Sequence, residues 1–140
     1  MKMFAILQVV IFPICLIIND MKFTKVIPSI FYENINDGLK LFVDCLEFAV
    51  THSELQTKAP LCVLEKGSLQ LYLFQDAQLA KEHNPELRLV TTNIQEVYDK
   101  VSTTHPQLLH PNLKTVTLRP WGAKEFALMD LQLGVRIQQW

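Results

Sequence analysis

Residues 118–130 read LRPWGAKEFALMD, and residues 134–140 read GVRIQQW. Pro120 and Gly122 break regular structure, so a turn between two extended segments is expected there. The segments on either side are rich in residues that suit a half-buried strand. Trp121 stands inside the turn, and loop residues often meet ligands. The end of the chain is therefore predicted to be a meander of three strands, with its most distinctive residues at one corner.

The same order of elements is predicted in both halves of the chain, and the meander ends the second half. In each half an asparagine, Asn34 or Asn93, is an N-cap before apolar residues at helical spacing. The expected helices are 35–46 and 94–104, the second ending before His105-Pro106. Lys66-Gly67 is expected to close a hairpin, and residues 76–85 to connect the halves with a helical turn. The strands are expected at 23–32, 48–52, 60–64, 68–75, 86–92, 113–119, 125–129 and 135–140. A doubled β-α-β-β-β unit is thus predicted.

The segment 119–122 (RPWG), followed by EFAL at 125–128, Asp130 and Gly134, resembles the C-terminal signature of a known superfamily. This is the glyoxalase/bleomycin resistance (vicinal oxygen chelate) superfamily, and the similarity is greater to its bleomycin-resistance-like branch. The resemblance covers about residues 23–140. It implies an α+β fold in which two βαβββ modules form curled mixed sheets around a cup. Several chemistries and some pure binders share this scaffold, so the fold does not select the function.

A second local match is residues 41–48, LFVDCLEF, where relatives commonly carry Phe-Tyr and then Leu-Gly-Phe. Glu47 takes the place of the usual glycine, so the turn after the first helix is expected to differ. Glu125 resembles a structural position of the bleomycin-resistance branch. It is therefore expected to support the fold first.

Composition narrows the function classes. A chain of 140 residues is expected to form one domain. Its 19% of charged residues and net charge of −1 give no basic footprint, which argues against a nucleic-acid partner. Cys15, Cys45 and Cys62 match neither a zinc cluster nor a disulfide framework, and packed, reduced thiols are expected. No glycine-rich phosphate loop is present.

The first 20 residues differ from the rest. Residues 1–18 are almost wholly apolar after Lys2, and polar residues follow at 19–22. This leader is open to three interpretations: a signal peptide without the usual small-residue cleavage site, a membrane anchor shorter than a spanning helix, or a start site wrongly assigned ahead of Met21. Residues 21–140 are taken as the glyoxalase/bleomycin-resistance-like domain. A cytoplasmic protein is expected, with a membrane contact only if the leader is an anchor.

Enzymes of the superfamily bind a divalent metal through His, Glu or Gln on the first and last strand of each module. The resemblance puts these positions near Ile27, Gln70, Glu86 and Gln138. Isoleucine cannot ligate a metal, and glutamine is a weak neutral donor beside the usual glutamate. The four histidines are expected in loops or at strand ends: His52, His83, His105 and His110. No metal, no other cofactor and no catalytic residue are therefore expected.

Alternation along the strands predicts which side chains line the cup. In the strand 68–75, Leu69, Leu71 and Leu73 should bury against a helix, which leaves the intervening residues on the concave side. The inferred lining is aromatic and polar, with arginines, and suits a polar aromatic or anionic ligand. The predicted ligand-binding residues are Trp121, Arg119, Tyr72, Phe74, Arg88, Gln70 and Gln138, with Arg136 as a further cation.

Structural roles compete with these assignments. Tyr72 and Phe74 also suit a core or a dimer interface, and Arg119 also suits an ion pair with Glu125 or Glu86. Trp121 also suits a plug over the core. Tyr98 and Asp99 are expected on a solvated helix face.

Three functions remain open. The leading hypothesis is a metal-free small-molecule binding protein, a homodimer that sequesters its ligand in a crevice between subunits and confers antibiotic resistance. The alternative is a metal-dependent lyase or dioxygenase of the same superfamily. The third is a structural or regulatory module tethered to a membrane by residues 1–18.

Overall fold

The computed structural model of the protein describes residues 21–140. The three interpretations of the leader, and the expectation for Cys15, concern residues outside this range. Among residues 21–140, none of the helices has the length and apolar character needed to cross a membrane.

The first module contains β1 (Ser29–Tyr32), α2 (Ile35–Leu39), the π-helical segment η1 (Lys40–Cys45), β2 (Ala49–Glu54), β3 (Leu61–Lys66) and β4 (Leu69–Gln75). A short helix, α3 (Ala77–Glu82), follows. The second module contains β5 (Glu86–Val90), α4 (Ile94–Thr104), the 3-10 turn η2 (Pro106–Leu108), β6 (Thr117–Leu118), β7 (Lys124–Met129) and β8 (Gly134–Gln139).

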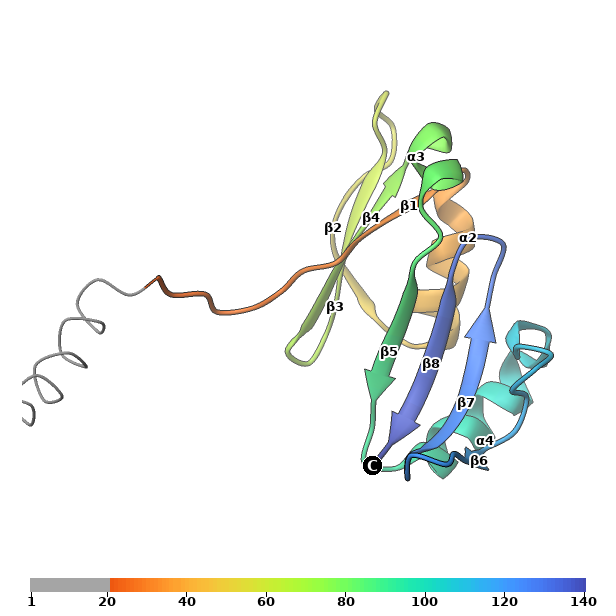
Figure 1. The fold of residues 1–140 in the computed structure, drawn as a ribbon. Helices are drawn as coiled ribbons and strands as arrows, with labels where there is room; N and C mark the ends of the chain where they lie inside the picture. Colours follow the sequence, from red (N-terminus) through yellow and green to blue (C-terminus); the bar gives the residue numbers. More distant parts are fainter. Residues whose placement is uncertain (1–20) are drawn as a thin grey trace, which may run out of the picture.

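Each module forms its own four-stranded mixed sheet, with the order β1-β4-β3-β2 in the first and β5-β8-β7-β6 in the second. In both sheets the first and last strands of the module pair in parallel, and the other pairs are antiparallel. Figure 1 shows the two sheets as separate layers connected through α3, each with its own helix. The prediction of two βαβββ modules in an α+β fold is confirmed.

The two modules repeat the same contacts at their helix starts. The side chain of Asn34 accepts a hydrogen bond at the first helix, and Asn93 does so at the second. The last strand of each module then supplies a glutamine to the same helix end. Gln75 Oε1 accepts from the Ile35 amide at 3.0 Å, and Gln139 Oε1 accepts from the Ile94 amide at 2.7 Å. These matched caps satisfy amides that a helix leaves unpaired.

Strand alternation divides each sheet into a helix-packed face and an opposite face, called here the helix-free face. Cys62, Leu64, Leu71 and Leu73 of the first sheet are buried with the helices, as are Phe126, Leu128, Val135 and Ile137 of the second. The helix-free face of the first module carries Phe31, Val63, Gln70, Tyr72 and Phe74, and that of the second carries Glu86, Arg88, Glu125, Arg136 and Gln138.

Leu69 is a correction to the predicted burial. Its side chain is 48% exposed, because it directly follows the hairpin turn at Gly67, beyond the part of β4 that the helices cover. Tyr98 is another correction: it is half-buried and packs edge-on against Phe126, with ring centroids 5.2 Å apart. Asp99 is exposed, as expected.

Two predicted strands are shorter than expected. Residues 21–28 are extended but belong to no strand, and pairing with β4 begins at Ser29. Pro28, which has no amide hydrogen, still accepts from the Tyr72 amide at 3.0 Å. In the second module only Thr117–Leu118 pairs as β6. Residues 110–113 instead run beside β7, where the Ala127 carbonyl accepts from His110 at 2.8 Å and the Ala127 amide donates to Leu113 at 2.9 Å.

The turn after the first helix keeps the conformation that glycine favours. Glu47 has a φ of +63°, a left-handed backbone that costs a side-chain-bearing residue energy. Its carboxylate lies 2.6 Å from Lys100 Nζ of α4, so this turn connects the first module to the second. The predicted difference at this position is therefore in the residue and its ion pair, while the backbone remains of the glycine type.

A second connection between the modules is partly buried. The Tyr32 hydroxyl donates to Asp130 Oδ2 at 2.7 Å, and burial together with the Asp130 charge raises the pKa of Tyr32. The Gln132 amide also donates to the carbonyls of Ala80 and His83 after β4. The turn between β7 and β8 is thus fixed to the first module.

Candidate functional site on the helix-free face of the second module

The centre of this face is a fully buried carboxylate. Glu125 on β7 has no exposed surface and accepts three side-chain hydrogen bonds. Trp121 Nε1 donates to Oε2 at 2.9 Å, Gln138 Nε2 to the same oxygen at 2.6 Å, and Arg136 Nη1 to Oε1 at 3.0 Å. The register of β7 against β8 explains the cluster, since Glu125 lies directly opposite Gln138.

These donors keep Glu125 ionised. Burial alone would raise the pKa of this carboxyl, but the hydrogen bonds from Trp121, Gln138 and Arg136, with the charge of Arg136, outweigh it and hold the pKa below its ordinary value. The structural role expected for Glu125 is consistent with this network. Its carboxylate also fixes the indole of the predicted ligand-binding residue Trp121.

Trp121 and Arg119 lie together at the corner of the meander. Gly122, with a φ of +101°, makes the turn, and the Gly122 amide donates to the Arg119 carbonyl at 2.9 Å. The guanidinium of Arg119 stands 4.8 Å from the centre of the Trp121 ring, a cation–π arrangement. Trp121 remains 51% exposed. An oriented, half-exposed indole of this kind is a suitable stacking surface for a ligand.

The three arginines of this face differ in how well they are paired. Arg136 Nε lies 3.2 Å from Glu86 and its Nη1 3.0 Å from Glu125. Arg88 lies 3.0 Å from the same Glu86 oxygen. Arg119 approaches only Glu125, at 4.0 Å, and its buried Nε has no hydrogen-bond acceptor among residues 21–140. Three guanidinium groups against two carboxylates leave the face one positive charge in excess.

The other predicted ligand-binding residues lie on the first sheet. Tyr72 and Phe74 pack edge-on with centroids 6.2 Å apart, and Phe74 stacks on Phe31 at 5.6 Å. Gln70 accepts from Lys25 and donates to Glu65. The seven predicted residues thus form an aromatic group on the first module and a polar group on the second. None of the cavities described below contains members of both.

The positions that the superfamily uses for metal do not fit an ion here. Gln138 Nε2 donates to Glu125, and Gln70 Oε1, the atom that would ligate a metal, accepts from Lys25. Glu86, the one anion of the four positions, is neutralised by Arg88 and Arg136. The adjacent guanidinium groups repel a divalent cation, and two neutral glutamines do not offset that repulsion. In the described part of the chain, no group of three or more His, Cys, Asp or Glu is arranged to hold a metal.

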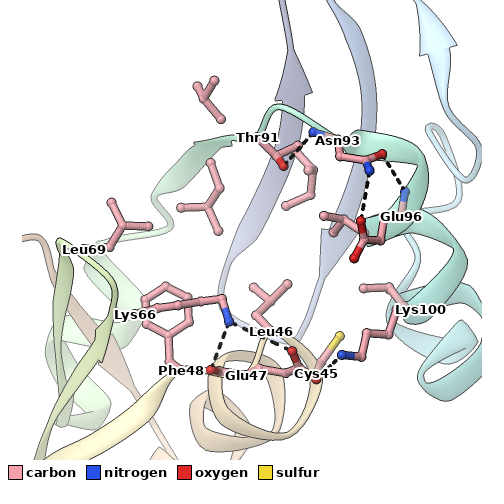
Figure 2. Close-up of a pocket in the computed structure, with 15 residues that line it drawn as sticks. Cys45, Leu46, Glu47, Phe48, Lys66, Leu69, Thr91, Asn93, Glu96 and Lys100 are labelled. Atoms are coloured by element: carbon pink, nitrogen blue, oxygen red, sulfur yellow. Dashed lines mark hydrogen bonds and ion pairs between the residues drawn. The ribbon is translucent and has the colours of Figure 1, made fainter.

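An apolar cavity of about 350 Å³ lies between the modules, and sequence reasoning did not predict it. Its walls include Leu46, Phe48, Leu69, Val97 and Ile137. Figure 2 shows charged side chains at its rim paired with one another: Lys66 and Lys100 approach Glu47, and Asn93 meets Glu96. Because the rim is self-paired, the cavity presents little that would select a polar ligand.

The cysteines of the described chain pack, as expected. Cys45 and Cys62 are free and buried. Burial, with the nearby charge of Glu47, raises the pKa of the Cys45 thiol to about 11, and burial raises that of Cys62. Both thiols therefore stay protonated near neutral pH, the unreactive form.

No family model and no curated protein matches the sequence. Solved structures do match. A bleomycin-binding protein complexed with bleomycin has a TM-score of 0.66 at 19% identity, over 84% of this chain and 99% of that one. The bleomycin-binding protein from Streptomyces verticillus, complexed with copper(II)-bleomycin, has a TM-score of 0.65 at 15% identity, over 84% and 96%. TioX from Micromonospora sp. ML1 has a TM-score of 0.68 at 9% identity, over 84% and 98%.

A further match, from Sphaerobacter thermophilus, is described as a member of the glyoxalase/bleomycin resistance protein/dioxygenase superfamily. The chain therefore has the glyoxalase/bleomycin resistance fold, as the sequence predicted. The matched bleomycin-binding proteins share it at identities that establish the fold alone.

Proposed function

We propose that the protein is a metal-free small-molecule binding protein that sequesters a polar aromatic or anionic ligand. The observation that supports this most is the cluster around Glu125, which orients a half-exposed indole beside an underpaired arginine. Trp121 provides a stacking surface, and Arg119 provides charge and hydrogen-bond donors. Gln138 stands at the base of the cluster, with Arg88 at its edge. The excess positive charge of the face favours an anionic group on the ligand.

The ligand crevice is proposed to form between two copies of the chain. In one chain the aromatic group of Gln70, Tyr72 and Phe74 lies on a different sheet from Trp121 and Arg119. Pairing the first module of one copy with the second module of another would place both groups around one ligand. Exposed apolar side chains support self-association, since Phe23 and Val26 in the extended segment 21–28 are 86% and 88% exposed.

The biological role proposed is resistance by sequestration in the cytoplasm, and the fold shared with two bleomycin-binding proteins supports the binding part of this role. The protein is proposed to act without chemistry on its ligand. The unsuitable metal positions and the protonated, buried thiols support this part of the proposal.

Isothermal titration of the full chain against a panel of aromatic and glycopeptide ligands tests the proposal. Binding of one ligand per crevice, weakened by Trp121→Ala and unchanged by a chelator, is the expected result. Trp140→Ala is the matched control, because that tryptophan is also exposed but lies outside the Glu125 cluster. If no ligand of the panel binds, the proposal of sequestration is contradicted.

The dimer is tested separately by light scattering. Phe23→Asp with Val26→Asp should shift the mass of the particle from two chains to one. If the wild-type protein stays monomeric at high concentration, the proposal of a crevice between two copies is contradicted.

A further inference from the structure

A second cavity of about 350 Å³ lies entirely within the second module. It is open on one side and lies beside β7, β8 and the segment 110–113, with Glu86 and Arg136 of the helix-free face in its lining. Its mostly polar lining includes Glu86, His110, Asn112, Arg119 and Arg136. Of these residues, Arg119 and Arg136 were predicted in the lining of the cup, whereas His110 and Asn112 are new.

We propose that this cavity binds a carboxylate group of the ligand. The inference rests on the proposed function only in taking the helix-free face of the second module as ligand-binding. Counting the side chains that line the cavity and those paired with them, three guanidinium groups stand against two carboxylates, which gives a sum of +1. A ligand group with one negative charge balances that charge, whereas a cationic group would add to it.

The donors around the cavity also point to an oxyanion. Arg136 is held by Glu86 and Glu125, but within residues 21–140 Arg119 has an ion pair only with Glu125, at 4.0 Å. A guanidinium with underused donors beside a polar cavity is suited to a planar carboxylate. His110 Nδ1 accepts from the Asn112 amide at 3.0 Å, so the neutral imidazole carries its proton on Nε2, as a further donor.

The Arg119 Nε shows why an acceptor is expected there. This atom is buried and has no acceptor within residues 21–140. An unmet buried donor costs free energy, and native proteins contain few of them. A carboxylate bound in the cavity would add an acceptor beside the Arg119 guanidinium, which already lies 4.8 Å from the centre of the Trp121 ring.

The test uses benzoate and benzamide, which have the same shape and differ in charge. The ¹⁵N-labelled full chain is titrated with each, and amide shifts at 110–113 and of the Arg119 Nε–H are followed. Benzoate should shift these signals with saturation, and benzamide should not. Arg119→Gln should weaken benzoate binding by roughly tenfold or more. Lys81→Gln should leave it nearly unchanged, because Lys81 is exposed on α3 and does not line the cavity.

Equal binding of the two probes, or benzoate shifts confined to other residues, would overturn the proposal even if Arg119→Gln fails to fold. Unchanged benzoate affinity in a folded Arg119→Gln protein would overturn it too. The result is separable from the proposed function, because the cavity needs one chain only. Benzoate binding independent of protein concentration supports the cavity even if the titration panel is silent. If a panel ligand binds the dimer without shifting the amide signals of residues 110–113, the role proposed for this cavity is contradicted, but the proposal of sequestration is not.

Discussion

The amide of Gln138 donates a 2.6 Å hydrogen bond to the buried carboxylate of Glu125. Gln138 occupies a position where metal-binding relatives are expected to have a metal-ligating side chain, yet here it hydrogen-bonds to a neighbouring side chain. Glu125 in turn holds Trp121 and Arg136. The helix-free face of the second module is thus organised around an internal anion.

Glu125→Gln should destabilise the protein by roughly 3 kcal/mol, the range for breaking a buried ion pair. The new amide would direct hydrogens at donors of Gln138, Trp121 or Arg136, and Arg136 would lose a buried partner. Urea denaturation measures the change. Glu86→Gln is the control, since Glu86 is partly exposed and its loss should cost much less. Equal effects of the two substitutions would contradict the role assigned to Glu125.

The same carboxylate makes stability depend on pH. Because the folded state lowers the pKa of Glu125, its contribution is complete above the unfolded value of about 4.3 and is lost as pH falls through the folded value. The stability difference between wild type and Glu125→Gln should therefore be constant near neutral pH and shrink in acid. Urea titrations over a pH series measure it. A stability difference that grows as the pH falls would contradict a lowered pKa of Glu125 in the folded state.

Gly38→Ala should destabilise the first module, although alanine is the better helix former by about 1 kcal/mol. A Cβ at this position would lie 2.5 Å from Cε2 of the buried Tyr32 ring, and overpacking costs about 1–3 kcal/mol. Thermal or urea unfolding measures the loss. Gly134→Ala is the matched control, because its Cβ would meet no atom within 4 Å.

A smaller side chain at Tyr32 should relieve the overpacking. The double variant Gly38→Ala with Tyr32→Leu should lose less stability than the sum of the single variants. Strict additivity would show that the ring and the glycine do not compete for space.

Glu47→Gly should unfold at a higher urea concentration than Glu47→Gln. Both variants lose the ion pair with Lys100, but only glycine relieves the left-handed backbone at φ +63°. Comparing the two isolates the backbone contribution. A lower midpoint for the glycine variant would indicate that side-chain packing, not the backbone, decides this turn.

Much of the fold was predictable because local signals agreed with one another. The capping residues Asn34 and Asn93, the helical spacing behind them and the Pro120–Gly122 turn all describe single segments of chain. Alternation also placed Leu71 and Leu73 in the core and Tyr72 on the opposite face. The duplication followed from the order of these local elements.

Features that depend on distant partners were not predictable. Tyr98 packs because Phe126 lies beneath α4, and no local pattern records that contact. His110 and Asn112 line a cavity only because residues 110–113 pair with β7. The network of Glu125 required the register of β7 against β8. The predicted ligand residues were individually plausible, but their division between two sheets became visible only in three dimensions.

Equilibrium dialysis of the full chain against zinc, manganese and ferrous ions, followed by elemental analysis, measures whether the helix-free face of the second module binds a divalent metal. We expect no stoichiometric metal in wild type, and none gained or lost on Glu86→Gln. One tightly held ion per site that disappears with Glu86→Gln or Gln138→Ala would contradict it.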